Sequence, residues 1–335
     1  MRIETLALLL QGQAAGLPEH RITDIFKPLA TPARAEAQIA ELTLAITGAI
    51  FLIVGFLIVF TLWRFRRKPG DDAHQEPAQV YGSNQIEIAW TAIPILIVFI
   101  LIGVSARVIA SVQNASPPAE ALKIRLIGHQ WWWEIHYSDY GIVDANEINM
   151  PATPDGRMAT YFELQSADVL HSIWIPQLSG KLDLIPNRTN YTWMDPRSPG
   201  IYFGNCAEYC GTQHAYMLLR VVARAPQDFK AWAAAEQKPA APAALASDGR
   251  KVFDSLACVN CHTIRGTRAV GTFGPDLTHL MSRQTIASGA LENSHDNLKA
   301  WVDNPQDAKP GCLMPSMKLG AQDLEAVTAY LELLK

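Results

Sequence analysis

The twelve residues CAEYCGTQHAYM, Cys206 to Met217, place two thiols, an imidazole and a thioether in one short segment. A second imidazole stands upstream, at His171 in the stretch LHSIWIP. Two thiolates and two imidazoles could hold one tetrahedral zinc ion, and the two thiols alone could form a disulfide. The soft thioether of Met217 favours copper instead. We therefore expect a binuclear copper centre bridged by Cys206 and Cys210, with weak axial donors from Met217 and the Glu208 carbonyl.

The residues on either side of this segment have the pattern of an all-β domain. LKIRLIG, ATYFELQ and MLLRVVAR are short runs that alternate or are rich in β-branched and aromatic residues, and turn-forming clusters such as MPATPDG and DPRSPG separate them. This spacing predicts a sandwich or barrel. We assign it to residues 116–228, with the soft-ligand loop between two of its strands.

A second metal-related motif, CVNCH, occupies residues 258–262. The pattern C-x-x-C-H is typical of c-type haem attachment, in which Cys258 and Cys261 bind the vinyl groups and His262 binds the iron. A redox dithiol or half of a zinc site are the alternatives. The sequence contains no second C-x-x-C motif to complete such a zinc site.

The haem iron needs a second axial donor, and KPGCLMPSM offers Met314 and Met317. We favour Met314, because Pro315 biases its backbone toward an extended conformation and KPG begins a tight loop. A flexible residue such as Met317 more often fills a core. His279 and His295 are competing donors that we expect at the surface, and the Pro275 carbonyl is expected to orient His262.

The segments that follow the all-β domain differ in composition from it. AAAEQKPAAPAALAS is rich in Ala and Pro and predicts a linker over residues 229–247. Beyond it, DGRKVFDSLACVNCH and AQDLEAVTAYLELL carry apolar residues at helical spacing. We expect an all-α domain over residues 248–335.

Two uncharged segments, Leu42–Leu62 and Ala89–Ala106, are each long enough to cross a bilayer as a helix. They predict a transmembrane hairpin over residues 38–115; two buried core helices are the alternative. RFRRK follows the first span, so the positive-inside rule places this loop in the cytoplasm and both termini on the outer face. Residues 1–37 form an N-terminal segment that begins like a signal peptide. The net charge of −4 argues against a nucleic-acid partner.

The spacing C-x3-C-x3-H-x2-M with an upstream HS resembles the CuA site of subunit II of haem–copper oxidases. GHQWWWEI and EIAWTAIP extend the resemblance, and the C-x-x-C-H domain resembles the caa3-type members that carry a fused cytochrome c. The resemblance implies a two-helix anchor in the bacterial cell (inner) membrane. It also implies a cupredoxin domain and a class I-like cytochrome c domain, both on the outer face.

The resemblance also implies roles for individual residues. The copper ligands of the family fall on His171, Cys206, Glu208, Cys210, His214 and Met217. The tryptophan that receives electrons falls on Trp131, whereas Trp132 departs from the usual Trp-Tyr-Trp order and offers an alternative ring. Glu87 matches a carboxylate associated with proton uptake, or is a solvated charge at a helix end. The Glu208 side chain is implied to hold magnesium at the interface with subunit I.

These features together predict the electron-input subunit of a proton-pumping terminal oxidase. It would pass electrons from haem c to the CuA centre and on to the oxygen-reducing subunit I. Implied partners are subunits I and III, and the donor would be a soluble or membrane cytochrome c or a quinol–cytochrome c reductase. The alternatives are a CuA and haem c subunit of a nitric-oxide reductase, or a free-standing membrane-anchored electron carrier.

Overall fold

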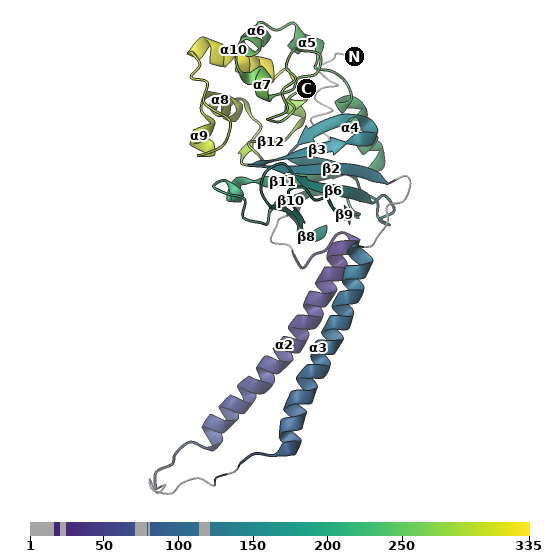
Figure 1. The fold of residues 1–335 in the computed structure, drawn as a ribbon, viewed down its shortest axis with the longest axis vertical. Helices are drawn as coiled ribbons and strands as arrows, with labels where there is room; N and C mark the ends of the chain where they lie inside the picture. The colour runs from purple at the N-terminus through teal and green to yellow at the C-terminus, as the bar shows by residue number, and fades with distance from the viewer. Residues whose placement is uncertain (1–16, 21–24, 71–78, 80, 114–120) are drawn as a thin grey trace. The chain divides into compact units, whose positions relative to one another are not determined.

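The computed structural model describes residues 17–20, 25–70, 79, 81–113 and 121–335 (Figure 1). The chain divides into two compact units, Ala35–Ala115 and the remainder. The predicted signal peptide falls within residues 1–16, outside the described part. Each unit is considered separately below.

The smaller unit contains most of α2 (Thr31–Arg64) and all of α3 (Asn84–Gln113). Both helices are long and apolar enough to cross a membrane, and their large apolar side chains are exposed. A helix that is apolar all round needs either a protein core or lipid around it. The predicted pair of apolar helices is therefore confirmed, and none of the apolar window of either helix is buried as a core helix would be.

The first part of the larger unit is a β-sandwich (Figure 1). One sheet has the order β5-β11-β10-β7-β8, and the short strand β1 (Glu19–His20) also pairs with β10. Its strands are β5 (Glu147–Pro151), β11 (Leu218–Arg224), β10 (Gly200–Cys206), β7 (His171–Ile175) and β8 (Ser179–Leu184). The second sheet has the order β4-β3-β2-β6-β9. Its strands are β4 (Ile142–Ala145), β3 (Trp132–Tyr137), β2 (Leu122–His129), β6 (Thr160–Ser166) and β9 (Asn190–Met194).

The sandwich core follows from the alternation of residues along its strands. In β2 and β3, every second side chain is buried, including Ile124, Leu126, Trp133 and Ile135. Side chains of a strand point alternately to the two faces of its sheet, so this pattern buries one face. The predicted cupredoxin-like sandwich is confirmed.

The C-terminal part of this unit is mainly helical, as predicted. Its helices are α6 (Asp248–Ser255), α7 (Cys258–Cys261), α8 (His295–Asp303), α9 (Pro305–Ala308) and α10 (Ala321–Leu331), and a small hairpin joins β12 (Thr285–Ile286) to β13 (Leu291–Glu292). Helix α10 packs on α6, where Gly249 faces the Ala326 carbonyl so closely that a Cβ atom would collide with it. Glycine at this position lets the two helices cross in contact.

The stretch 229–247, whose composition predicts a linker, is partly helical. It contains most of α4 (Pro226–Glu236) and all of α5 (Pro242–Leu245). Phe229 and Trp232 pack in the sandwich core, whereas Ala244 packs in the core of the helical domain. Pro226 and Pro242 lie in the first turns of α4 and α5, where proline is tolerated, and the alanines that follow favour a helix.

The sandwich and the helical domain pack directly against each other. Arg283 donates from Nε to Oδ1 of Asp144 across 2.8 Å, and both side chains are buried. The buried Glu147 carboxylate accepts hydrogen bonds from the backbone of Gln284 and from the backbone and hydroxyl of Thr285. Burial raises the pKa of Glu147. These polar contacts fix the orientation of the two domains.

Candidate metal and haem centres

The first candidate site lies in the loop between β10 and β11. β10 ends at Cys206, the 3-10 turn η2 (His214–Tyr216) follows, and β11 begins at Leu218. The Cys206 amide donates to the Met217 carbonyl across 2.9 Å, which closes the loop. His171 is the first residue of β7, which pairs with the end of β10, so its imidazole faces the loop.

The loop and His171 together bring six donor atoms into a near-symmetric arrangement. The Sγ atoms of Cys206 and Cys210 are 3.8 Å apart. Near Cys206 lie Nδ1 of His171 at 3.9 Å and the Glu208 carbonyl at 3.2 Å. Near Cys210 lie Nδ1 of His214 at 3.7 Å and Sδ of Met217 at 3.8 Å. Each sulfur therefore has one imidazole and one weaker donor beside it.

This arrangement fits two metal ions better than the alternatives. A disulfide would need its sulfur atoms about 2.05 Å apart, and the two cysteines are free. Around a single zinc ion with bonds of about 2.0–2.3 Å, all four donor atoms would lie within about 4 Å of one another. His171, Cys206 and Cys210 form a compact group with donors within 4.8 Å, and His214 lies outside it. The donors thus form two overlapping sets, with the thiols shared between them.

Neighbouring groups prepare these donors for metal binding. Asp168 Oδ1 lies 2.8 Å from Nε2 of His171, which leaves Nδ1 directed at the loop. Burial lowers the pKa of His171, but the hydrogen bonds and charges of Asp168 and Cys206 together outweigh it, so that the pKa is raised. The hydrogen bond between the two thiols lowers the pKa of Cys206 and raises that of Cys210. Bound cations would deprotonate both thiols.

Trp131 contacts the loop directly. Its indole Nε1 donates to the Cys210 carbonyl across 3.0 Å, and Gln130 Nε2 donates to the same oxygen across 2.8 Å. A Cβ atom on Gly211 would lie 3.0 Å from the indole ring, so the glycine permits this approach. Of the three consecutive tryptophans, Trp132 stacks on His129 and Trp133 is buried in the sandwich core.

The second candidate site surrounds the C-x-x-C-H motif. Nδ1 of His262 lies 2.8 Å from the Pro275 carbonyl, as the sequence predicts, which leaves Nε2 free to bind a metal. Burial lowers the pKa of His262 and favours the neutral imidazole that a metal requires. A Cβ atom on Gly274 would lie 2.7 Å from Cε1 of the ring, so this imidazole packs closely on glycine.

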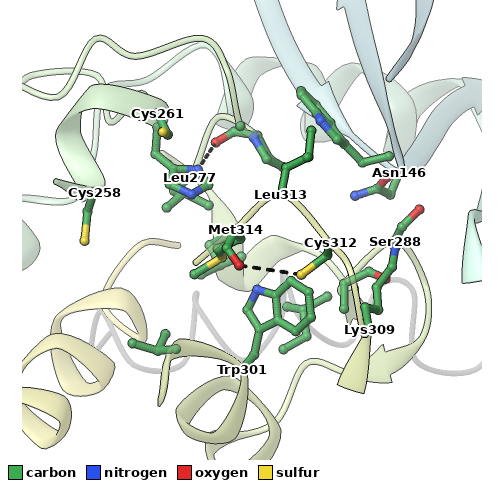
Figure 2. A pocket seen from close by; sticks show the side chains of 18 of the residues that line it. Asn146, Cys258, Cys261, Leu277, Ser288, Trp301, Lys309, Cys312, Leu313 and Met314 are labelled. Atoms are coloured by element: carbon green, nitrogen blue, oxygen red, sulfur yellow. Dashed lines mark hydrogen bonds between the residues drawn. The ribbon is translucent and has the colours of Figure 1, made fainter. Parts of the chain in front are cut away.

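His262 faces a largely apolar cavity of about 220 Å³ (Figure 2). Its lining includes Leu277, Leu298 and Trp301, together with Cys258, Cys261, Met314 and Met317. Figure 2 shows the two cysteines at one side and Asn146, Ser288 and Lys309 at the other, with Met314 between them. Two thiols, an oriented imidazole and an apolar lining fit a covalently attached haem.

The competing haem donors lie elsewhere. His279, which the sequence places at the surface, is buried, and its Nε2 lies 2.9 Å from the Lys238 carbonyl. His295 pairs with Glu332. Neither histidine lines the cavity, whereas Met314 and Met317 both do, so the preference for Met314 stays a prediction.

Two further predicted residues have simple surroundings. Glu87 lies in the first turn of α3, where the helix dipole favours a carboxylate. The Glu208 side chain is 41% exposed, and its Oε2 lies 3.6 Å from Lys181 Nζ. The proton-uptake role of Glu87 and the magnesium role of Glu208 stay predictions.

Sequence reasoning missed Asp168 and Lys309. Asp168 precedes His171 by three residues, and a carboxylate so close to a ligand histidine is a signal that the sequence contains. Lys309 lies in the quoted stretch KPGCLMPSM, but its partners are distant in the chain and no local pattern indicates them.

Comparison with known proteins covers most of the chain. The family model for the cytochrome c oxidase subunit II transmembrane domain matches residues 21–108, and the model for its periplasmic domain matches residues 154–224. A cytochrome c model matches residues 246–335. Cytochrome c oxidase subunit 2 of Alkalihalophilus pseudofirmus is 37% identical over 300 residues, which cover 87% of this chain and 84% of that protein. Cytochrome c oxidase subunit 2 of Bacillus subtilis is 32% identical over 350 residues, which cover 98% and 95%.

Proposed function

The chain belongs to the subunit II family of cytochrome c oxidases and carries a cytochrome c domain at its C-terminal end, and from this premise we propose how it conducts electrons. The two families imply a CuA copper centre and a haem c. Subunit II also implies a complex with subunit I of a haem–copper oxidase. The two apolar helices fit a membrane anchor.

In this proposal the two candidate sites are the copper and haem sites of the subunit. The copper ligands are His171, Cys206, Glu208 through its carbonyl, Cys210, His214 and Met217. The haem is bound by Cys258, Cys261, His262 and Met314. When bound, these groups supply one-electron chemistry, while the chain holds, orients and shields them. The near-symmetric donor arrangement and the oriented His262 support the assignment.

Trp131 carries the proposed route between the two sites. It lines the haem cavity, and its indole donates to the carbonyl of the copper-loop residue Cys210 across 3.0 Å. Among the three tryptophans, Trp132 also lines the cavity, but its ring stacks on His129. The contact of Trp131 with both sites is the observation that supports electron transfer from the haem domain to the copper domain.

The wider setting of the subunit follows from its family and its charge pattern. We propose that both soluble domains lie on the outer face of a bacterial inner membrane, because RFRRK between the spans favours a cytoplasmic loop. Electrons would arrive from a soluble or membrane cytochrome c, or from a quinol–cytochrome c reductase, and continue to subunit I. Subunit III is a further expected partner. The named relatives favour an oxidase over a nitric-oxide reductase subunit or a free-standing carrier.

A pair of tryptophan variants tests this route in the purified oxidase. A laser flash excites an added photoreductant, which reduces haem c, and the arrival of the electron at copper is followed optically. Trp131→Phe should slow this transfer while both absorption spectra stay unchanged, because it removes the indole contact with the Cys210 carbonyl and alters no ligand. Trp132→Phe is the control and should transfer at the wild-type rate. The reverse ranking would show that Trp132 carries the route.

A further inference from the structure

Lys309 of the cytochrome c domain is a buried cation with only 3% of its surface exposed. Its Nζ donates to three main-chain carbonyls, those of Trp131 at 2.9 Å, Tyr216 at 3.0 Å and Ala287 at 3.3 Å. These bonds use all three N–H donors of the ammonium group. In the described part of the chain, no carboxylate forms an ion pair with Lys309.

Two of the three acceptors belong to the copper domain, and both adjoin the copper loop. The indole of Trp131 donates to the Cys210 carbonyl, and the Trp131 carbonyl accepts from Lys309. Lys309 therefore holds the backbone of a residue whose side chain contacts the copper loop. Tyr216 directly precedes Met217, so its carbonyl belongs to the peptide that leads into this proposed ligand. A parallel contact runs from Gln213 Nε2 to the Pro310 carbonyl, across 2.6 Å.

Lys309 also stands at the start of the loop that carries Met314. The Lys309 carbonyl accepts from the Cys312 amide across 3.0 Å, which forms a turn two residues before Met314. A single side chain therefore connects the methionine loop of the haem site with Trp131 and with the methionine loop of the copper site. Cavity-lining residues of both domains meet here.

Stability alone does not account for a cation at this position. Removing an ammonium group from water costs several kcal/mol, and a carboxylate would normally compensate for it. Here burial lowers the pKa of Lys309 to about 8. A neutral apolar side chain would avoid this cost, but it could not bind three carbonyls that converge from two domains.

We propose that Lys309 is a positioning residue for electron transfer between the domains. Its hydrogen bonds hold Trp131 and the peptide that precedes Met217 at a fixed distance from the Met314 loop. Lys309 touches neither metal ligand nor haem iron in this role, and acts through Trp131. The inference rests on the proposed route through Trp131.

The test uses Lys309→Met and Lys309→Gln in the full chain within the oxidase. Lys309→Met keeps an unbranched side chain as far as Cε and removes all three donors, and should slow transfer from haem c to copper by about tenfold or more. Lys309→Gln keeps two N–H donors and should give an intermediate rate. The haem and copper spectra should not change, because no ligand is altered.

A second readout does not depend on the loaded enzyme. This readout uses the full chain without copper. In the structure, the Leu218 amide donates to the Ser288 carbonyl of the other domain across 3.1 Å. Lys309→Met should accelerate hydrogen exchange at Met217 and Leu218, because the copper loop loses its anchor on the haem domain. Exchange within α10 should stay at the wild-type rate.

Two controls separate positioning from general effects. Gln284→Ala removes another side-chain hydrogen bond between the domains, the one that its Oε1 accepts from Arg220 Nη1 across 3.0 Å. Lys299→Met removes a partly exposed cation of the same domain, which pairs with Glu325. Both controls should transfer electrons at rates near that of the wild type.

The inference and the proposed route can fail separately. If Trp131→Phe is slow but Lys309→Met matches Gln284→Ala, the positioning role is refuted and the route stands. If Lys309→Met alters the copper or haem spectrum, Lys309 supports a metal site instead, which also overturns the inference. If Trp131→Phe transfers at the wild-type rate, the proposed route itself is wrong.

Discussion

Replacing Arg283 with Met tests the contact that joins the two soluble domains. Arg283 is the buried partner of Asp144, at 2.8 Å, and also donates from Nη2 to the Asp276 carbonyl across 2.7 Å. Without it, the Asp144 carboxylate stays buried, and no other cation among the described residues forms an ion pair with it. Breaking a buried pair on one side costs about 3–5 kcal/mol. For a unit of this size, each kcal/mol lowers the melting temperature by about 2–4 °C, so we expect a loss of about 10 °C.

A double variant gives this prediction its control. Asp144→Asn combined with Arg283→Met removes both charges, and should recover most of the lost stability because no buried charge remains unpaired. Calorimetry of the detergent-solubilised chain measures both variants under the same conditions. If the single variant unfolds within about 1 kcal/mol of the wild type, below the cost of a broken buried pair, the contact does not hold the domains together. A double variant no more stable than the single one would contradict the charge argument.

Three further predictions concern the metal sites and the pH dependence of stability. Cys206→Ser should abolish the mixed-valence copper signal in electron paramagnetic resonance, since the thiolate would bridge both ions; a retained signal would exclude bridging. Met314→Ala should remove the sulfur–iron charge-transfer band and lower the haem potential, whereas Met317→Ala should keep the band; the reverse result would assign the ligand to Met317. Burial, with the nearby Asp144 charge, raises the pKa of Glu236 from 4.5 to about 8. Its stabilising contribution is therefore complete below pH 4.5 and lost as the pH rises toward 8, so Glu236→Gln should flatten this decline in thermal unfolding across the same range.

The copper site could be predicted from the sequence because its donors are close together in the chain. Five of the six proposed donors lie between Cys206 and Met217, where the order of residue types already limits the chemistry. The sixth, His171, reaches the loop through the pairing of β7 with β10. Similarly, the Pro275 carbonyl lies thirteen residues from His262, within one loop of the haem domain.

The features that sequence reasoning missed depend on contacts between distant segments. Residues 229–247 have the composition of a linker, but Trp232 packs against Tyr137 with ring centroids 5.1 Å apart, and this burial orders the helix. Lys309 meets Trp131 across 178 positions of the chain. No local pattern in the sequence specifies such contacts, because they arise only when two domains pack together.

The number of copper ions per haem c measures the central claim most directly. The chain is purified without its partner subunits and reconstituted with copper. It is then analysed for copper, zinc and covalently bound haem. Two overlapping donor sets that share Cys206 and Cys210 predict two copper ions and one haem per chain. One copper ion per haem, or zinc in place of copper, would contradict the binuclear centre and the electron route that ends there.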